Sequence, residues 1–229
     1  MSSIHSLAEL TARVDRLAER SAPDRAVLGI TGPPGAGKTT LADALVQRLN
    51  VGPTGKPCSS AAHVPMDGFH LADIELDRLG RRARKGAPDT FDPGGYFALL
   101  GRLRTTRDTV WAPAFDRHVE QPIAGSIAVG PDVRIIISEG NYLLSDEPGW
   151  RGGQGVFDEI WYCGGDTALR VQRLVERHQQ FGKSLEEATR WIQQVDDVNA
   201  AMIERTRDHA DVVITGDVVI GVPAVGAGC

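Results

Sequence analysis

The sequence has little that would tie it to a membrane, a nucleic acid or an oxidising compartment. Its 229 residues carry a net charge of −5, so the whole molecule offers no basic excess for a polyanion. No apolar run is long enough to span a bilayer, and the first twenty residues carry charges throughout, unlike a secretory signal. The three cysteines, Cys58, Cys163 and Cys229, are scattered and form no CxxC pair, which is typical of free thiols. We therefore expect a cytoplasmic protein that binds neither nucleic acids nor membranes.

Apolar segments alternate along the chain between strand-like and helix-like patterns. Leu7, Leu10, Val14 and Leu17 repeat at helical spacing and predict an amphipathic helix at about 3–20. Strands are predicted at 25–30, 62–66, 133–138, 158–163 and 210–214, and helices at 38–49, 167–180 and 184–208. Strands that alternate with helices imply an α/β fold, in which helices cover both faces of a mostly parallel sheet. The tail after Asp217 stays unassigned.

A glycine-rich loop follows the first predicted strand and opens the first predicted helix of the sheet. Gly32 to Thr39 reads GPPGAGKT, which matches G-x-x-x-x-G-K-[ST] in full. The glycines let backbone N–H groups converge on one anion, and the helix adds its positive N-terminal end. Lys38 can reach the β- and γ-phosphates, and the Thr39 hydroxyl can coordinate Mg²⁺. An ordinary glycine turn would not explain the Lys-Thr pair, so we predict a bound nucleoside triphosphate.

Two carboxylates lie at positions where a kinase with a phosphate-binding loop would need an acidic residue. Asp67 follows the strand predicted at 62–66, and Glu139 follows the strand predicted at 133–138. Ligands of open α/β sheets bind at the carboxyl ends of strands, so Asp67 is a candidate proton acceptor and Glu139 a candidate Mg²⁺ ligand. Other interpretations stay open, because Asp67-Gly68 is also a common turn and Glu139 could face solvent.

Two clusters of basic residues stand out in this acidic protein. The first is a candidate anion-recognition site, although such runs are usually solvated; it contains Arg78, Arg81, Arg82, Arg84 and Lys85. The second recurs at i, i+3 and i+7 of one predicted helix and contains Arg170, Arg173 and Arg177. It is either a solvent-facing stripe or part of a lid that closes over the phosphates, with a hinge at Gly182. His70, His118 and His178 do not have the spacing of a metal site.

Together these segments resemble a family of P-loop kinases. The stretches GPPGAGKTT, PMDGFHL, RKGAPDTFD, PAFDRHVE, IISEGNYLL and RLVERHQQFGKS are similar to the uridine kinase, phosphoribulokinase and pantothenate kinase group. The likeness is strongest to its bacterial nucleoside/nucleotide kinase-like branch, often labelled fructose transport system kinase, and runs from about Ala26 to Ile214. It implies a P-loop NTPase three-layer sandwich with a mostly parallel five-stranded sheet, a helical lid, and the use of ATP and Mg²⁺.

The resemblance also assigns roles to particular residues. It places Asp67 at the position of the catalytic acid, and it matches Arg173 and Arg177 to lid arginines. In the segment that lines the acceptor pocket, Phe115 replaces the usual tyrosine, which removes a hydroxyl and weakens the case for uridine. We assign the following residues to the acceptor pocket: Asp67, His70, Arg82, Lys85, Phe115, Asp116, Arg117 and Glu139.

The sequence therefore predicts one kinase domain over residues 1–229, with an acceptor-binding insertion at about 68–125 and a lid at about 167–185. Its catalytic residues are Asp67, Lys38 and Arg173, and Thr39 and Glu139 hold Mg²⁺. ATP is predicted to contact Gly32, Pro33, Pro34, Gly35, Ala36, Gly37, Lys38, Thr39, Thr40, Arg173 and Arg177. The expected partner is a small hydroxyl-bearing acceptor, which could be a sugar, a nucleoside or a pantothenate-like molecule, and a homodimer stays open. The alternative is a regulatory ATPase without an acceptor.

Overall fold

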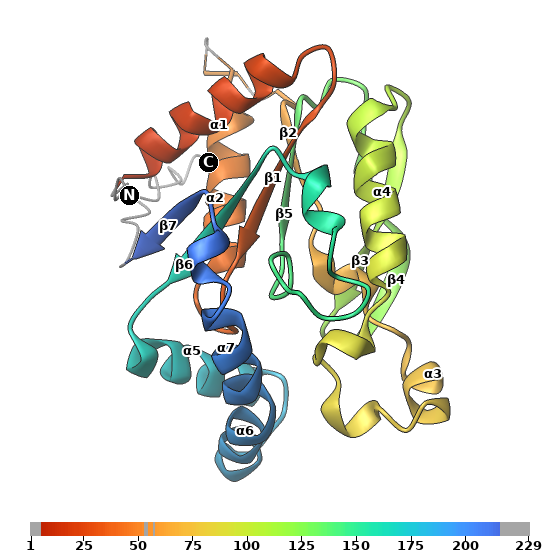
Figure 1. The fold of residues 1–229 in the computed structure, drawn as a ribbon, viewed down its shortest axis with the longest axis vertical. Helices are drawn as coiled ribbons and strands as arrows, with labels where there is room; N and C mark the ends of the chain where they lie inside the picture. Colours follow the sequence, from red (N-terminus) through yellow and green to blue (C-terminus); the bar gives the residue numbers. More distant parts are fainter. Residues whose placement is uncertain (1–5, 53–54, 57, 216–229) are drawn as a thin grey trace, which may run out of the picture.

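A parallel five-stranded sheet forms the centre of the protein (Figure 1). The computed structural model describes residues 6–52, 55–56 and 58–215. Its sheet has the strand order β2-β5-β1-β6-β7, and all neighbouring strands pair in parallel. The strands are β1 (Ala26–Thr31), β2 (Ala61–His63), β5 (Ile135–Glu139), β6 (Glu159–Gly164) and β7 (Val212–Thr215). Every residue of β1 and β5 is buried, as expected for strands that are covered on both faces. The predicted parallel five-stranded sheet is confirmed.

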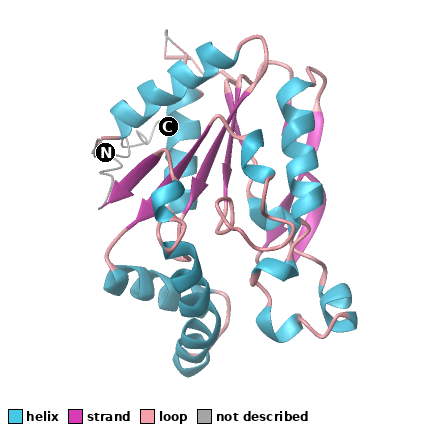
Figure 2. Ribbon diagram, viewed as in Figure 1, coloured by secondary structure: helices cyan, strands magenta, loops and turns pink. Residues whose placement is uncertain are grey.

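Helices cover both faces of this sheet and complete three layers (Figure 2). Two helices, α1 (Leu7–Ser21) and α2 (Lys38–Leu49), pack on one face together with Leu28 of β1. Helix α4 (Pro93–Thr105) packs on the other face, in a core that contains Val27 of β1. The predicted three-layer sandwich is therefore confirmed. The N-terminal helix begins at Leu7, behind a capping box of Ser6 and Glu9, and residues 3–5 of its predicted range lie outside the described residues.

The second predicted strand is shorter than the sequence pattern suggested. Strand β2 ends at His63, and the Val64 N–H still donates to the carbonyl of Ile137 at 2.9 Å. Pro65 has no N–H to continue the ladder, so the chain turns into the 3₁₀ helix η1 (Met66–Phe69). Asp67 therefore lies in a tight turn at the carboxyl edge of the sheet.

The insertion after η1 has a structure of its own that the sequence pattern did not predict. Its elements are α3 (Asp73–Arg78), η2 (Arg82–Arg84), η3 (Pro88–Thr90), α4, β3 (Val110–Asp116) and β4 (Gln121–Val129). Strands β3 and β4 form an antiparallel ribbon with a bulge between Ala112 and Ala114. In Figure 1 this ribbon lies behind α4, and α3 projects beyond the carboxyl ends of the sheet strands.

The C-terminal helices project beyond the same edge, on the other side of the molecule (Figure 1). They are α5 (Thr167–Gln180), α6 (Leu185–Trp191) and α7 (Asp197–Glu204), joined by the π-helical turn η5 (Ile192–Asp196) and followed by the 3₁₀ helix η6 (Arg207–His209). The helix predicted over 184–208 is present as an unbroken helical run from Leu185 to Glu204 that contains the π-helical turn, and it ends four residues earlier than predicted. The capping box of Ser184 and Glu187 is confirmed.

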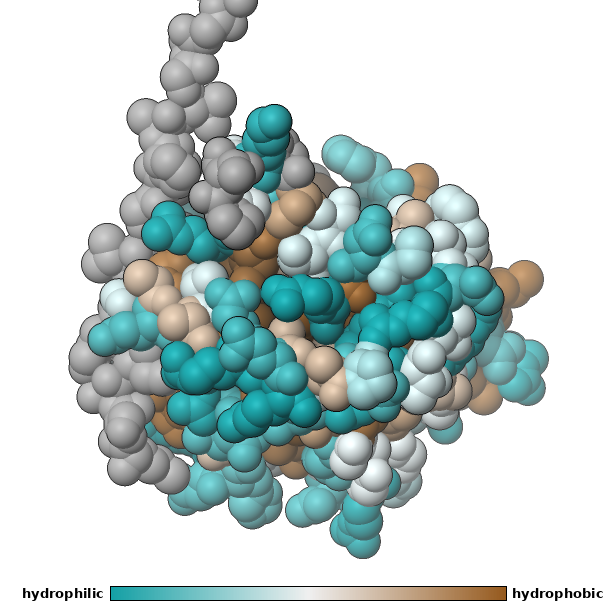
Figure 3. Space-filling view, turned by 90° about the horizontal axis from the view of Figure 1, so that it is seen from above, coloured by the Kyte–Doolittle hydropathy of each residue, from teal (hydrophilic) through white to brown (hydrophobic). Residues whose placement is uncertain are grey.

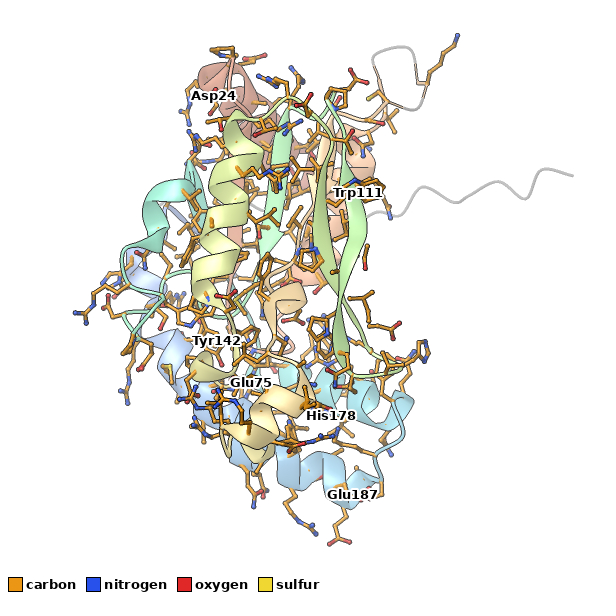
Figure 4. All side chains as sticks on the ribbon, turned by 90° about the vertical axis from the view of Figure 1, so that its right-hand side faces the viewer. Asp24, Glu75, Trp111, Tyr142, His178 and Glu187 are labelled. Atoms are coloured by element: carbon orange, nitrogen blue, oxygen red, sulfur yellow. The ribbon has the colours of Figure 1, made fainter. Side chains whose placement is uncertain are left out.

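Polar side chains predominate on the end of the molecule that lies away from these projecting helices, as seen from above in Figure 3. Figure 4 shows Asp24 at that end, and Glu75, His178 and Glu187 at the opposite one. Within the described residues, no helix is both long enough and apolar enough to cross a membrane. The segment after Asp217 and Cys229 lie outside the described residues.

Candidate active site

The glycine loop joins β1 to α2 in a conformation that strongly favours glycine at two positions. Gly35 and Gly37 have φ angles of 80° and 88°, in the left-handed region. A Cβ on Gly35 would lie 2.8 Å from the carbonyl oxygen of Arg170 in α5, so this glycine also lets α5 pack directly on the loop. Gly37 is the N-cap of α2, and the first residue of the helix is Lys38. The strand–loop–helix arrangement predicted for phosphate binding is therefore present.

Lys38 is buried and anchored inside the loop. Its Nζ donates to the carbonyl oxygens of Gly32 at 2.8 Å and Pro33 at 3.0 Å, and to Oδ1 of Asn141 at 2.8 Å. Burial lowers the pKa of Lys38, and the nearby carboxylates of Glu139 and Asp67 oppose this shift. Asn141 was missed at the sequence level; its place two residues after Glu139 was the available signal.

Glu139 is the last residue of β5 and faces the start of α2. The Thr39 hydroxyl donates to Glu139 Oε1 at 3.0 Å. Burial raises the pKa of Glu139, and the negative charge of Asp67 raises it further. No group of three or more His, Cys, Asp and Glu side chains in the described ranges could enclose a metal ion. One hydroxyl and one carboxylate nevertheless suit Mg²⁺, which commonly takes few protein ligands and completes its shell with water and phosphate oxygens.

Asp67 lies half-buried at the opposite wall of the site, and Arg117 of the ribbon is its ion-pair partner. The Arg117 guanidinium donates to Asp67 Oδ2 at 2.8 Å. Burial alone would raise the pKa of Asp67, but the positive charges of His70, Arg117, Arg177 and Lys38 outweigh it and hold the pKa below its ordinary value. Asp67 is therefore ionised at neutral pH.

Aromatic rings line the wall next to Asp67. The His70 ring lies between those of Phe91 and Phe115, at centroid distances of 4.0 and 4.7 Å. Lys85 Nζ lies 5.2 Å from the centroid of the Phe115 ring, and the guanidinium carbon of Arg117 lies 5.5 Å from it. The structure does not bring Asp116 to this wall, because its carboxylate accepts hydrogen bonds from the N–H groups of His118 and Val119 in the turn of the ribbon.

The first basic cluster is matched by carboxylates of the same insertion. Asp73 contacts Lys85 at 2.7 Å and Arg82 at 2.9 Å, and Arg82 also pairs with Asp77 at 2.9 Å. The other three arginines form pairs as well, Arg78 with Glu75, and Arg81 and Arg84 with Asp89. The side chains of Arg78, Arg82 and Arg84 are exposed, so much of this cluster is solvated, and each of its cations has a carboxylate partner.

The arginine face of α5 is turned toward the glycine loop. Arg170 is buried and donates to Asp197 at 2.6 Å and to the carbonyl oxygen of Pro34 at 3.5 Å. Arg173 lies over the loop, with Nη1 3.7 Å from the Cβ position of Gly37. Burial lowers the pKa of Arg177, and the negative charges of Asp196 and Asp67 act in the opposite direction. This face contacts the loop, so the alternative of a purely solvent-facing stripe is wrong.

These walls enclose one cleft of about 960 Å³ at the carboxyl edge of the sheet. Its lining includes most of the predicted site residues: Pro34, Gly35, Gly37, Lys38, Thr39, Thr40, Asp67, His70, Arg82, Lys85, Phe115, Arg117, Glu139, Arg173 and Arg177. The lining does not include Gly32, Pro33, Ala36 or Asp116. Residues that the sequence did not single out also line it, among them Asp73, Phe91, Phe181, Lys183 and Trp191, because they reach the cleft only through the fold of the insertion and of the C-terminal helices.

Comparisons with known proteins agree with this geometry. No protein-family model matches the chain. A protein of Schizosaccharomyces pombe named "Putative uridine kinase C227.14" is 32% identical over 197 residues, which make up 83% of this chain and 83% of that protein. The "ATP-dependent kinase YFH7" of Lachancea thermotolerans is 28% identical over 71% of this chain and 59% of its own length. The crystal structure of a "putative fructose transport system kinase" from Silicibacter sp. TM1040 is 38% identical, with a TM-score of 0.79 over 91% of this chain and 98% of that one.

The sheet order, the glycine loop and the strand-end carboxylate define a P-loop nucleotide-binding fold. With the identity and coverage of these relatives, the chain belongs to the family of ATP-dependent P-loop kinases that includes the proteins named for uridine kinase and fructose transport system kinase. The resemblance that the sequence motifs indicated is confirmed.

Proposed function

We propose that the protein transfers the γ-phosphoryl group of ATP to a hydroxyl group of a small metabolite. The observation that carries this proposal is that Asp67 and Lys38 line one cleft and influence each other's pKa. A kinase needs a cation at the phosphates and a carboxylate at the acceptor hydroxyl, and it needs both in one place.

The glycine loop and its neighbours would bind the triphosphate. Lys38 already donates to the carbonyl oxygens of its own loop, so its ammonium is held at the level where the β- and γ-phosphates would lie. Thr39 and Glu139 would hold Mg²⁺, which when bound offsets negative charge on the phosphates. Arg173, which lies over Gly37, would stabilise the charge that develops on the transferring group.

Asp67 would orient the acceptor hydroxyl and take its proton. Its low pKa keeps the carboxylate ionised, and its pair with Arg117 fixes one oxygen at 2.8 Å while the other stays available to the acceptor. A carboxylate of low pKa is a weak base, but phosphoryl transfer passes through a loose transition state in which positioning contributes more than strong basicity.

The walls of the cleft favour an uncharged acceptor. Arg82, Lys85 and Arg117 already have carboxylate partners in Asp73 and Asp67. An anionic acceptor would have to displace these carboxylates or lie against their negative charge, whereas hydroxyl groups can accept from the cations and donate to the carboxylates at once. The rings of Phe91 and Phe115 would pack against the apolar face of a sugar or nucleoside. We therefore place neutral polyols, sugars and nucleosides ahead of acceptors that bear a carboxylate.

An acceptor screen tests this proposal. ATP consumption is measured with neutral polyols, sugars and nucleosides and with their carboxylated or phosphorylated counterparts, and the product is identified by ³¹P NMR. We expect one neutral acceptor to raise ATP consumption by roughly a hundredfold or more, since correct positioning commonly contributes that much, and Lys38→Met to abolish the increase. A slow hydrolysis that no acceptor changes would contradict the proposal and would favour a regulatory ATPase.

A further inference from the structure

His63 lies behind the Thr39–Glu139 pair and has an unusual environment. It is the last residue of β2, and its ring reaches toward both α2 and the end of β5. Nδ1 lies 2.9 Å from Oδ1 of Asp43, and Nε2 lies 3.9 Å from Oε1 of Glu139. Among the residues that the structure describes, Nε2 of His63 is the one buried side-chain nitrogen or oxygen atom without a hydrogen-bond partner. A buried polar atom of this kind calls for an explanation.

The contact with Asp43 decides which ring nitrogen of His63 carries the proton. An ionised carboxylate can only accept a hydrogen bond, so Nδ1 must be the donor to Asp43. The other ring nitrogen, Nε2, faces Glu139 Oε1, which already receives the Thr39 hydroxyl. The two atoms lie 3.9 Å apart, too far for a direct hydrogen bond, and Nε2 has no hydrogen-bond partner among the described residues.

A water molecule between Nε2 of His63 and Oε1 of Glu139 can hydrogen-bond to both atoms. Magnesium keeps several of its water ligands when it binds to a protein. Metal sites also commonly contain residues that do not touch the metal but hydrogen-bond to its ligands and hold them in position. We propose that His63, oriented by Asp43, accepts a hydrogen bond from a water in the hydration shell of the divalent cation held at Thr39 and Glu139. His63 is thereby a positioning residue for the hydrated cation, and this inference rests on the metal site of the proposed function.

Binding of Mn²⁺, which can be followed by electron paramagnetic resonance, tests this assignment without any turnover. The titration is made on the full chain with a non-hydrolysable ATP analogue and no acceptor. We expect His63→Ala to weaken Mn²⁺ binding by about tenfold, the lower end of the effect of removing such a partner. His63→Gln offers an amide oxygen as acceptor and should restore much of the affinity. Exposed His209, which lies outside the cleft in η6, gives the matched control His209→Ala, which should bind Mn²⁺ like the wild type.

A second variant tests the orienting role of Asp43. Asp43→Ala removes the carboxylate that contacts Nδ1 at 2.9 Å, so the ring loses the partner that orients it. Mn²⁺ affinity should therefore fall even though His63 is present. This variant also keeps the test valid if His63→Ala fails to fold, as judged by its melting curve in the absence of metal.

Three results would overturn the inference. The first is a His63→Ala variant that binds Mn²⁺ as tightly as the wild type. The second is an equal loss of nucleotide affinity with and without the cation, which would show a merely structural role. The third is a wild-type protein that binds no Mn²⁺ at the nucleotide. Each of these results is distinct from a failure of the proposed phosphotransferase activity, which the acceptor screen measures separately.

Discussion

Replacement of Arg117 tests the electrostatic environment of Asp67. We consider Arg117→Met, which keeps an unbranched chain against the Phe115 ring and removes the guanidinium that lies 2.8 Å from Asp67 Oδ2. The pair stabilises the ionised form of Asp67, so its loss should raise the pKa of that carboxyl group. Because the reaction needs Asp67 ionised, the rate falls as the pH drops through this pKa. The acidic limb of the pH–rate profile should therefore move to higher pH.

The size of this shift follows from the exposure of the two side chains. Asp67 is 28% exposed and Arg117 is 37% exposed, so water screens the pair. A pair of this kind contributes about 1 kcal/mol at most, which at 1.36 kcal/mol per pH unit corresponds to about 0.7 unit. The assay is the single-turnover rate between about pH 2.5 and pH 8, a range that includes the titration of Asp67. Arg151→Met is the matched control, since Arg151 is 75% exposed and only loosely paired with Asp146. A limb that stays in place or moves to lower pH would refute the reasoning.

Two further predictions concern the stability of the fold, and urea unfolding checks both. Gly35→Ala should destabilise the protein by about 2–4 kcal/mol, because the new methyl group would lie 2.8 Å from the carbonyl oxygen of Arg170 and the positive φ would add strain. Gly80→Ala is the control: Gly80 has a similar φ with open space around it, so the substitution should cost only about 1 kcal/mol. An equal cost at both positions would contradict the packing of α5 on the loop. Arg25 is fully buried and donates to the carbonyl oxygens of Val133, Leu103, Thr106 and Gly130. Arg25→Met should therefore cost about 3 kcal/mol by leaving these acceptors unpaired, and an unchanged midpoint would show that water replaces the guanidinium.

The segments that the sequence predicted well are those in which local pattern and final structure agree. The glycines and the Lys-Thr pair of the loop need a strand before them and a helix after them, and β1 and α2 are found there. Glu139 was placed correctly at a strand end, because β5 is buried on both faces and its apolar run stops there. The start of α6 was correct because the capping box of Ser184 and Glu187 is a purely local signal.

The parts that the sequence did not predict depend on contacts between distant segments. Strand β4 is largely exposed, so it lacks the apolar alternation that marks a half-buried strand, and Pro122 and Gly125 further weaken the pattern. The π-helical turn at Ile192–Asp196 inserts an extra residue that no periodicity announces. The pairing of Arg117 with Asp67 joins residues 50 positions apart, so only the folded ribbon brings them together. The same holds for His63 and Glu139, which meet because β2 and β5 are neighbours in the sheet.

The measurement that tests the account most directly is the single-turnover rate of phosphoryl transfer in Asp67→Asn, once an acceptor has been found. Asparagine keeps the size of the side chain and can still accept a hydrogen bond from Arg117, but it cannot take a proton. We expect the rate to fall by roughly a hundredfold or more, the usual contribution of a proton acceptor, with little change in the affinity for ATP. Transfer at the wild-type rate would show that Asp67 is not the residue that receives the acceptor's proton.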